Sequence, residues 1–304
     1  MYHTLLVPLD GSPFSERALP VAASVAHAAK ARIVLVRVTS GAMPPGGDAA
    51  PTERKAIDDV QTYLAGVAGR LTGQGIQTDT AAPHGSAAEG ILDEMNARQA
   101  DMVIMCTHGR SGLGRWAYGS VAEAVLAKSA APILLVYPTG PLARLGQTPG
   151  SFKVLVPLDG SAFAEAALPH AAALANMLGG ALVLLRAVSP QIGYYPDPVL
   201  GQPYVSQVTE KALQEQEDEA KAYLSKVADG VSGAAISAQQ IVRIGWPGSV
   251  ILDEARLRGA ELIAMSTHGT TGIGERLLGG IAHDVLVRGM FPLLLVRPGE
   301  LTKD

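Results

Sequence analysis

Cysteine, clustered basic residues and long apolar runs are all scarce in this 304-residue chain, and each scarcity excludes a class of protein. The single cysteine, Cys106, excludes an internal disulfide framework and fits a reducing compartment. The net charge is −4 and the basic residues are scattered, so the sequence predicts no nucleic-acid partner. The longest apolar runs, such as 133–137 and 291–296, are too short to span a bilayer, and we expect no membrane partner.

Familiar catalytic and cofactor motifs are missing too. No G-x-x-x-x-G-K-S/T loop is present, so there is no P-loop lysine to stabilise a leaving phosphate. The dinucleotide fingerprint G-x-G-x-x-G does not follow the first expected strand, and no cluster of Cys, His or carboxylates suggests a metal site. We therefore assign no catalytic residue and no metal ligand. Residues 1–4 lack the basic head of a signal peptide, so we expect a soluble cytoplasmic protein.

The same domain is encoded twice. The stretch L-V-P-L-D-G-S ends at Ser12 and again at Ser161, with Asp10 corresponding to Asp159 at an offset of 149. From Tyr63 and Tyr223 onwards the offset is 160, so the second copy carries 11 extra residues within 189–209. Internal similarity over the whole length indicates two tandem domains. A join rich in Pro and Gly predicts a first domain over 1–140, a linker over 141–151 and a second domain over 152–304.

In each copy, short apolar runs alternate with Ala-rich helical stretches, which predicts a parallel sheet covered on both faces. We expect strands at 4–9, 32–38, 76–81, 101–106 and 133–137, and at 153–158, 181–188, 236–243, 261–266 and 293–297. We expect helices in the first copy near 14–30, 53–71, 87–99 and 120–129. Pro20 and Pro169 must kink the first helix of each copy or delay its start. Right-handed crossovers then give two Rossmann-like, doubly wound domains of five strands in the order 3-2-1-4-5.

Ligands of such sheets bind beyond the carboxyl ends of the strands where the order reverses, here between the first and fourth strands. The fourth strand ends in M-C-T-H-G, and a helical pattern begins nine residues later at Gly119-Ser120. A glycine-rich loop before a helix start directs backbone N–H groups at a phosphate. The second copy repeats this arrangement as M-S-T-H-G followed by Gly279-Gly280.

Several side chains near this point have two interpretations. Asp10 either caps the turn before the helix that Ser12 begins or accepts hydrogen bonds from a ribose or adenine, and its recurrence as Asp159 favours ligand contact. We interpret His108 and His268 as loop residues that contact phosphate, with a general base as the alternative. Cys106 is interpreted as an inert apolar residue, and Trp116 and Trp246 as packing residues.

These motifs resemble those of the universal stress protein family, and the chain is similar to its tandem members. The resemblance rests on V-P-L-D-G-S, on the T-H-G loop, and on V-A-E at 121–123 followed by A-P-I-L-L-V at 131–136, and it covers nearly the whole chain. It implies an adenine nucleotide as ligand (ATP, AMP or ADP), with Mg²⁺ possible on the phosphates. It places the nucleotide at Pro8, Leu9, Asp10, Val38, Met105, Cys106, His108, Gly109, Gly119, Ser120 and Val121. In the second copy it names Pro157, Leu158, Asp159, Ala187, Met265, Ser266, His268, Gly269, Gly279, Gly280 and Ile281.

Two departures from the family motif, which is G-x-x-G, nine residues and then G-S/T, separate the copies. The leading glycine is Cys106 in the first and Ser266 in the second, and both are small. The final hydroxyl residue is Ser120 in the first copy but Gly280 in the second, which removes one hydrogen bond of roughly 1 kcal/mol. We expect the first copy to bind ATP more tightly.

The resemblance implies a nucleotide-binding regulatory protein of the stress response, whose nucleotide switches a partner interaction or its own assembly. Slow Mg²⁺-dependent ATP hydrolysis and a nucleotide-free dimerising scaffold are the alternatives, with a flavin protein a weaker one. We expect the copies to pair through their last strands, since unpaired edges invite association, and a homodimer to follow by symmetry. The extra segment of the second copy is interpreted as a surface loop, with a lid or a docking surface as the alternatives.

Overall fold

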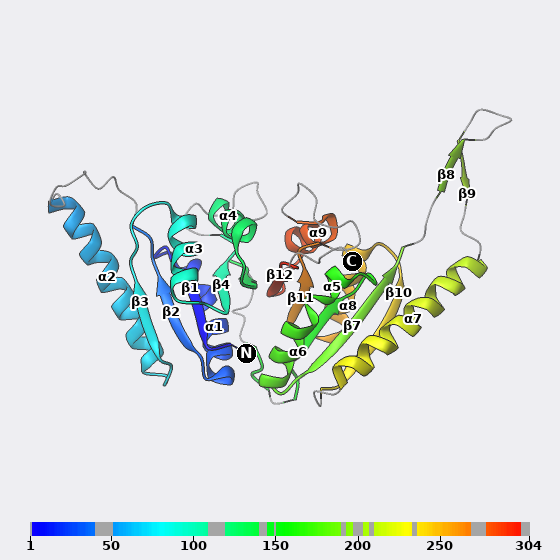
Figure 1. The fold of residues 1–304 in the computed structure, drawn as a ribbon, viewed down its shortest axis with the longest axis horizontal. Coiled ribbons are helices and arrows are strands. Elements are labelled where there is room, and N and C mark those ends of the chain that lie inside the picture. Colours follow the sequence, from blue (N-terminus) through cyan, green and yellow to red (C-terminus); the bar gives the residue numbers. More distant parts are fainter. Residues whose placement is uncertain are drawn as a thin grey trace.

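The computed structural model describes residues 2–39, 51–108, 119–139, 145–148, 150–189, 193–196, 203–206, 210–232, 236–268 and 278–298. Figure 1 shows two similar halves, each with strands between helices, meeting at the centre of the molecule. The expected fold class is confirmed in both halves.

The first half contains β1 (Thr4–Pro8), a 3₁₀ turn η1 (Ser15–Arg17), α1 (Ala18–Ala29), β2 (Arg32–Val36), α2 (Pro51–Thr72), β3 (Thr78–Ala81), α3 (Ala87–Ala97), β4 (Met102–Cys106), α4 (Ser120–Lys128) and β5 (Ile133–Val136). The second contains β6 (Lys153–Pro157), α5 (Ala162–Glu165), α6 (Leu168–Met177), β7 (Ala181–Val188), β8 (Gly193–Pro196), β9 (Pro203–Ser206), α7 (Glu210–Ser232), β10 (Ala238–Ile244), α8 (Pro247–Arg258), β11 (Leu262–Ser266), α9 (Gly280–Arg288) and β12 (Leu293–Val296).

The strands form one ten-stranded sheet in the order β10-β7-β6-β11-β12-β5-β4-β1-β2-β3. Each half therefore has the order 3-2-1-4-5, and neighbouring strands within a half are parallel. The halves meet where β5 pairs with β12 in antiparallel register, with Leu134 opposite Leu294. This is the expected pairing of last strands, and each of these strands covers the other's edge.

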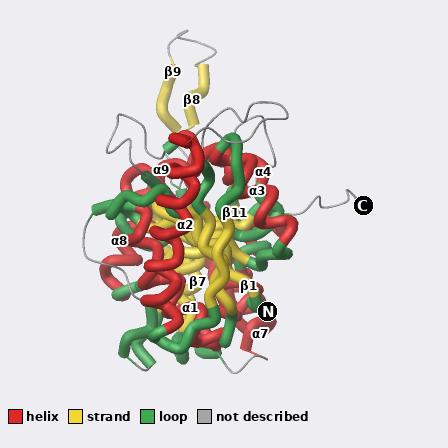
Figure 2. Tube along the Cα trace, turned by 90° about the vertical axis from the view of Figure 1, so that its left-hand side faces the viewer, coloured by secondary structure: helices red, strands yellow, loops and turns green. Residues whose placement is uncertain are grey.

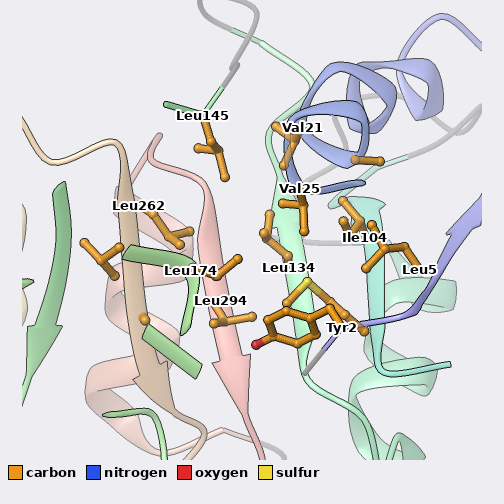
Figure 3. Packing of buried hydrophobic residues seen from close by; sticks show 14 of the residues in the cluster. Tyr2, Leu5, Val21, Val25, Ile104, Leu134, Leu145, Leu174, Leu262 and Leu294 are labelled. Atoms are coloured by element: carbon orange, nitrogen blue, oxygen red, sulfur yellow. The ribbon is translucent and has the colours of Figure 1, made fainter. Parts of the chain in front are cut away.

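Helices cover both faces of the sheet, as Figure 2 shows from the side. One face packs on α1, α2, α6 and α7 and includes the fully buried Leu5 and Leu35. The other packs on α3, α4, α8 and α9 and includes Leu6 and Val34. Both apolar layers run through the two halves, and Figure 3 shows Tyr2, Leu134, Leu174 and Leu294 meeting across the junction. The halves thus share a continuous core.

The two prolines delay the first helix of each copy. In the first half η1 ends at Arg17 and α1 begins at Ala18, so Pro20 lies in the first turn, where a missing N–H costs little. In the second half α5 ends and α6 restarts at Leu168, immediately before Pro169. Within the extra segment, β8 and β9 form an antiparallel hairpin that projects away from the second half (Figure 1).

Candidate functional site

Each half has a cavity at the carboxyl ends of its first and fourth strands, where the strand order reverses. The cavity of the first half, cavity 1, has a volume of about 590 Å³. The cavity of the second half, cavity 2, has a volume of about 370 Å³. Of the residues that the family resemblance assigned to a nucleotide, cavity 1 is lined by Pro8, Leu9, Asp10, Val38, Met105, Cys106, His108, Gly119, Ser120 and Val121. Cavity 2 is lined by Pro157, Leu158, Asp159, Ala187, Met265, Ser266, His268, Gly279, Gly280 and Ile281.

The remaining two, Gly109 and Gly269, lie outside the described residues. The structure therefore brings together, in each half, a carboxylate from the end of one strand and a helix start about a hundred residues further along the chain. The separation in sequence disappears because β1 and β4, and likewise β6 and β11, are neighbours in the sheet.

The D-G-S sequence forms the same turn twice. Oδ1 of Asp10 accepts a hydrogen bond from the Ser12 N–H at 2.8 Å, and Ser12 Oγ accepts from the Ser15 N–H at 3.2 Å. Gly11 has a φ of 83°, a left-handed conformation that suits glycine. In the second half Asp159 Oδ1 accepts from the Ser161 N–H at 3.0 Å, and Gly160 has a φ of 85°. The aspartate therefore does cap the turn, and the same turn places its carboxylate at the cavity wall.

The start of α4 is held beside the end of β4 by backbone hydrogen bonds. The Gly119 N–H donates to Thr107 O at 2.7 Å, and the Thr107 N–H donates to Val136 O at 2.8 Å. Gly119 is the N-cap of α4 and has no side chain to cap the first N–H groups. In the second half Gly279 donates to Thr267 O at 2.8 Å and is the uncapped N-cap of α9. Each cavity thus receives the partial positive charge of a helix start.

Histidine and cysteine side chains complete the loop side of the wall. Nδ1 of His108 lies 3.1 Å from Thr107 Oγ1, and His268 makes the same contact with Thr267, so both rings are oriented by the preceding threonine. Burial raises the pKa of the Cys106 thiol, which is 6% exposed. A raised thiol pKa fits the interpretation of Cys106 as unreactive.

Sequence reasoning missed the part of the wall that comes from β2, α2 and α3. Arg37, Thr39 and Asp59 line cavity 1 in addition to the predicted residues. The Arg37 guanidinium carbon lies 4.8 Å from the centre of the Tyr63 ring, and Tyr63 Oη donates to Glu16 Oε1 at 2.9 Å.

The second half repeats this trio as Arg186, Tyr223 and Glu165, with 6.0 Å and 2.9 Å for the same two contacts. Identical polar residues at all three corresponding positions of the repeat are the sequence signal that could have identified the trio. The prediction for Trp246 was wrong, because its side chain is 65% exposed at the start of α8 instead of packed. Trp116 lies outside the described residues.

Over the part of the chain that the structure describes, no three His, Cys, Asp or Glu side chains are grouped so that they could hold a metal ion. None of the helices in those same ranges has the length and apolar character needed to cross a membrane.

Comparison with known proteins places both halves in one family. A family model described as the universal stress protein family matches residues 1–137 and 151–297. A universal stress protein of Mycolicibacterium smegmatis is 28% identical over 306 residues, covering 97% of each chain. One from Synechocystis is 28% identical over 153 residues, covering 49% of this chain and 99% of its own. The crystal structure of a universal stress protein from Archaeoglobus fulgidus has a TM-score of 0.70 at 20% identity, covering 98% of this chain and 97% of its own, which shows the shared fold.

Proposed function

Because the chain belongs to the universal stress protein family, we propose that it is an adenine-nucleotide-binding regulatory protein of the stress response. Bound ATP, ADP or AMP would switch its assembly or its interaction with a protein partner. One observation carries the proposal: a strand-end carboxylate and an uncapped helix start line the same cavity, and this arrangement occurs twice in the chain.

The donor and acceptor types around cavity 1 suit the two ends of a nucleotide. The backbone N–H groups at the start of α4 would bind phosphate, and any Mg²⁺ would arrive with the phosphates. Asp10 has the wrong charge for phosphate, so it would accept hydrogen bonds from a ribose hydroxyl or an adenine amine. The cavity volume of about 590 Å³ falls within the range of sites for small molecules.

Gly119 adds support, because neither its conformation nor its packing against the described residues requires glycine. Its φ of −73° suits any residue, and an added Cβ would lie 3.5 Å from Thr107 O, which is ordinary contact. A ligand that must approach the backbone closely is a physical reason for a residue without a side chain at this position. The same reasoning applies to Gly279, whose added Cβ would lie 3.4 Å from Thr267 O.

The decisive experiment is titration of the purified full chain with ATP, ADP and AMP by calorimetry. We expect two sites, the tighter one in the first half. Asp10→Asn keeps an oxygen that can accept from the Ser12 N–H, so the turn survives while the charge is lost. We expect this variant to weaken the tighter site by roughly tenfold, the value of a hydrogen bond to a charged group. Asp159→Asn is the matched variant and should weaken the other site.

Two outcomes would replace this proposal. If the chain releases no nucleotide on heating and binds none on titration, it is a nucleotide-free scaffold whose domains serve only in dimerisation. ATP turnover that Asp10→Asn abolishes would make the protein a slow ATPase, whereas turnover that survives both aspartate variants belongs to a contaminant. A homodimer in a cytoplasmic setting remains part of the proposal, and light scattering of the full chain with and without ATP tests the assembly.

A further inference from the structure

The residues that follow the two last strands each cross into the other half. Tyr137 follows β5, and its Oη donates to Leu286 O of the second half at 2.7 Å. Arg297 follows β12, and its Nη1 donates to Ala127 O of the first half at 2.7 Å. Tyr137 and Arg297 are separated by 160 residues, the offset of the repeat at this point, so they occupy the same position in the two copies.

Both acceptors lie in the last turn of a helix that begins at a cavity. Ala127 belongs to α4 and Leu286 to α9. The last four carbonyl groups of a helix have no partner within it, so an external donor there holds the end of the helix. Each helix has nine residues and spans about 13 Å at 1.5 Å per residue. Its other end, at Gly119–Val121 or Gly279–Ile281, lines the cavity.

Each of these helices is therefore held by both halves of the molecule. Its own half holds the cavity end, through the Gly119 N–H bond to Thr107 O and the matching Gly279 N–H bond to Thr267 O. The opposite half holds the far end, through Arg297 for α4 and Tyr137 for α9. A helix this short depends on tertiary contacts for its order and direction. Arg297 also places a cation at the negative end of α4.

We propose that Tyr137 and Arg297 are positioning residues for the nucleotide site of the opposite half: Arg297 for cavity 1 and Tyr137 for cavity 2. Neither residue is among the described residues that line cavity 1 or cavity 2, and each acts through the direction of the helix that it holds. This inference rests on the proposed function, because the helix starts that are positioned are those that would bind phosphate. It makes the two sites parts of one assembly, since each is completed by the half that does not contain it.

The test follows hydrogen exchange at two amides of the full chain by NMR during titration with ATP. Glu123 N–H and His283 N–H donate to Gly119 O and Gly279 O at 3.0 Å each, so they report the cavity ends of α4 and α9 separately. Arg297→Met removes the donor and the charge, and Arg297→Lys keeps both. Tyr137→Phe removes only the hydroxyl and retains the ring.

We expect each variant to act in the half that it does not belong to. Arg297→Met should speed exchange at Glu123 without ATP and raise the ATP midpoint of cavity 1 by about two- to tenfold, the range of one hydrogen bond. His283 and cavity 2 should be unchanged. Tyr137→Phe should give the reverse pattern, and Arg297→Lys should stay close to the parent chain.

An effect confined to the variant's own half, an equal effect on both halves, or no effect overturns the inference. If ATP neither binds the parent chain nor protects either amide, the proposed function fails, while exchange without ATP still shows whether each residue positions the opposite helix. The two proposals therefore fail by different observations.

Discussion

Cavity 1 and cavity 2 share a frame but differ in what lines it. The D-G-S turn and the Thr-His contact recur with nearly the same distances in both halves. The wall beside them differs. Val38 lines cavity 1 where Ala187 lines cavity 2, and Ser120 stands where the second half has Gly280. Backbone geometry was retained after duplication, whereas the side chains that set the size and polarity of the cavity diverged.

The divergence is compensated in the packing behind the wall. A Cβ on Gly90 of α3 would lie 2.9 Å from Val38 Cγ2, so the larger residue just after β2 requires the smaller residue on the helix. The second half has the opposite pair, Ala187 on the strand and Val250 on the helix, at the corresponding positions of the repeat. The two halves thus fill the same layer with the volume distributed differently.

The largest expected effect comes from mixing these pairs. Gly90→Val in the first half should overpack the layer, cost about 2–3 kcal/mol of stability and push Val38 towards the cavity. Adding Val38→Ala installs the pair of the second half and should recover most of the loss. Urea midpoints and ATP titration measure both effects. A double variant as unstable as the single one would show that the two halves do not pack equivalently.

A second difference lies in one buried carboxylate. Glu254 accepts from Arg243 at 2.7 Å and Arg258 at 3.0 Å, and its side chain is 7% exposed. Glu94 pairs with Arg98 at 3.2 Å and is 21% exposed. Glu254→Ala should lower the free energy of unfolding by roughly 1–2 kcal/mol, which is less than for a fully buried ion pair because both arginines are partly exposed. Glu94→Ala should cost less than about 1 kcal/mol. If the two variants had equal urea midpoints, Glu254 would stabilise its half no more than Glu94 stabilises the other.

The ion pairs of Glu254 with Arg243 and Arg258 also predict that stability depends on pH. Burial raises the pKa of Glu254, but hydrogen bonds from the two arginines outweigh burial and leave the pKa below its ordinary value. The stabilisation is therefore complete above the unfolded pKa of about 4.3 and is lost as pH falls through the lower folded value. The difference in urea midpoint between the parent chain and Glu254→Ala should shrink across that window.

A smaller effect is expected at the start of α9. A Cβ added at Gly280 would have no neighbour within 4 Å among the described residues, so we expect Gly280→Ser to fold normally and to supply a hydroxyl group at the position that corresponds to Ser120. We expect ATP to bind cavity 2 about fivefold more tightly, the value of one hydrogen bond. Ser120→Gly should weaken cavity 1 by the same factor. If calorimetry finds neither change in affinity, the hydroxyl of Ser120 does not contact the nucleotide.

The smallest expected effect concerns His170, where the first half has the fully buried Val21. Tyr2 Oη lies 2.8 Å from His170 Nδ1, and burial lowers the pKa of His170. The unfolded chain then binds the proton first, so stability should fall as pH drops below about 6.5. The double variant Tyr2→Phe with His170→Val should lose less stability between pH 7 and 5.5. If the melting temperatures of the parent chain and the double variant fell equally between pH 7 and 5.5, this prediction would be wrong.

Much of the fold could be predicted because its signals are local. The short apolar runs predicted the strands in both copies of the repeat, and right-handed crossovers then required the order 3-2-1-4-5 in each half. That order alone placed Asp10 beside the start of α4. The exact ends of the strands were less predictable. The strand expected from residue 76 begins at Thr78, because hydrogen-bonded pairing with β2 decides where the strand starts.

The amino-acid sequence by itself determined the duplication, the layered architecture and the meeting of each strand-end aspartate with a helix start, since those follow from periodicity, chirality and turn chemistry. Only the tertiary structure decided that Arg37 reaches the cavity wall, that Trp246 is exposed, and that Tyr137 and Arg297 hold helices of the opposite half. Such contacts join residues far apart in the chain, and no local pattern records which distant carbonyl a side chain will meet. The packing of the two halves around β5 and β12 settles that.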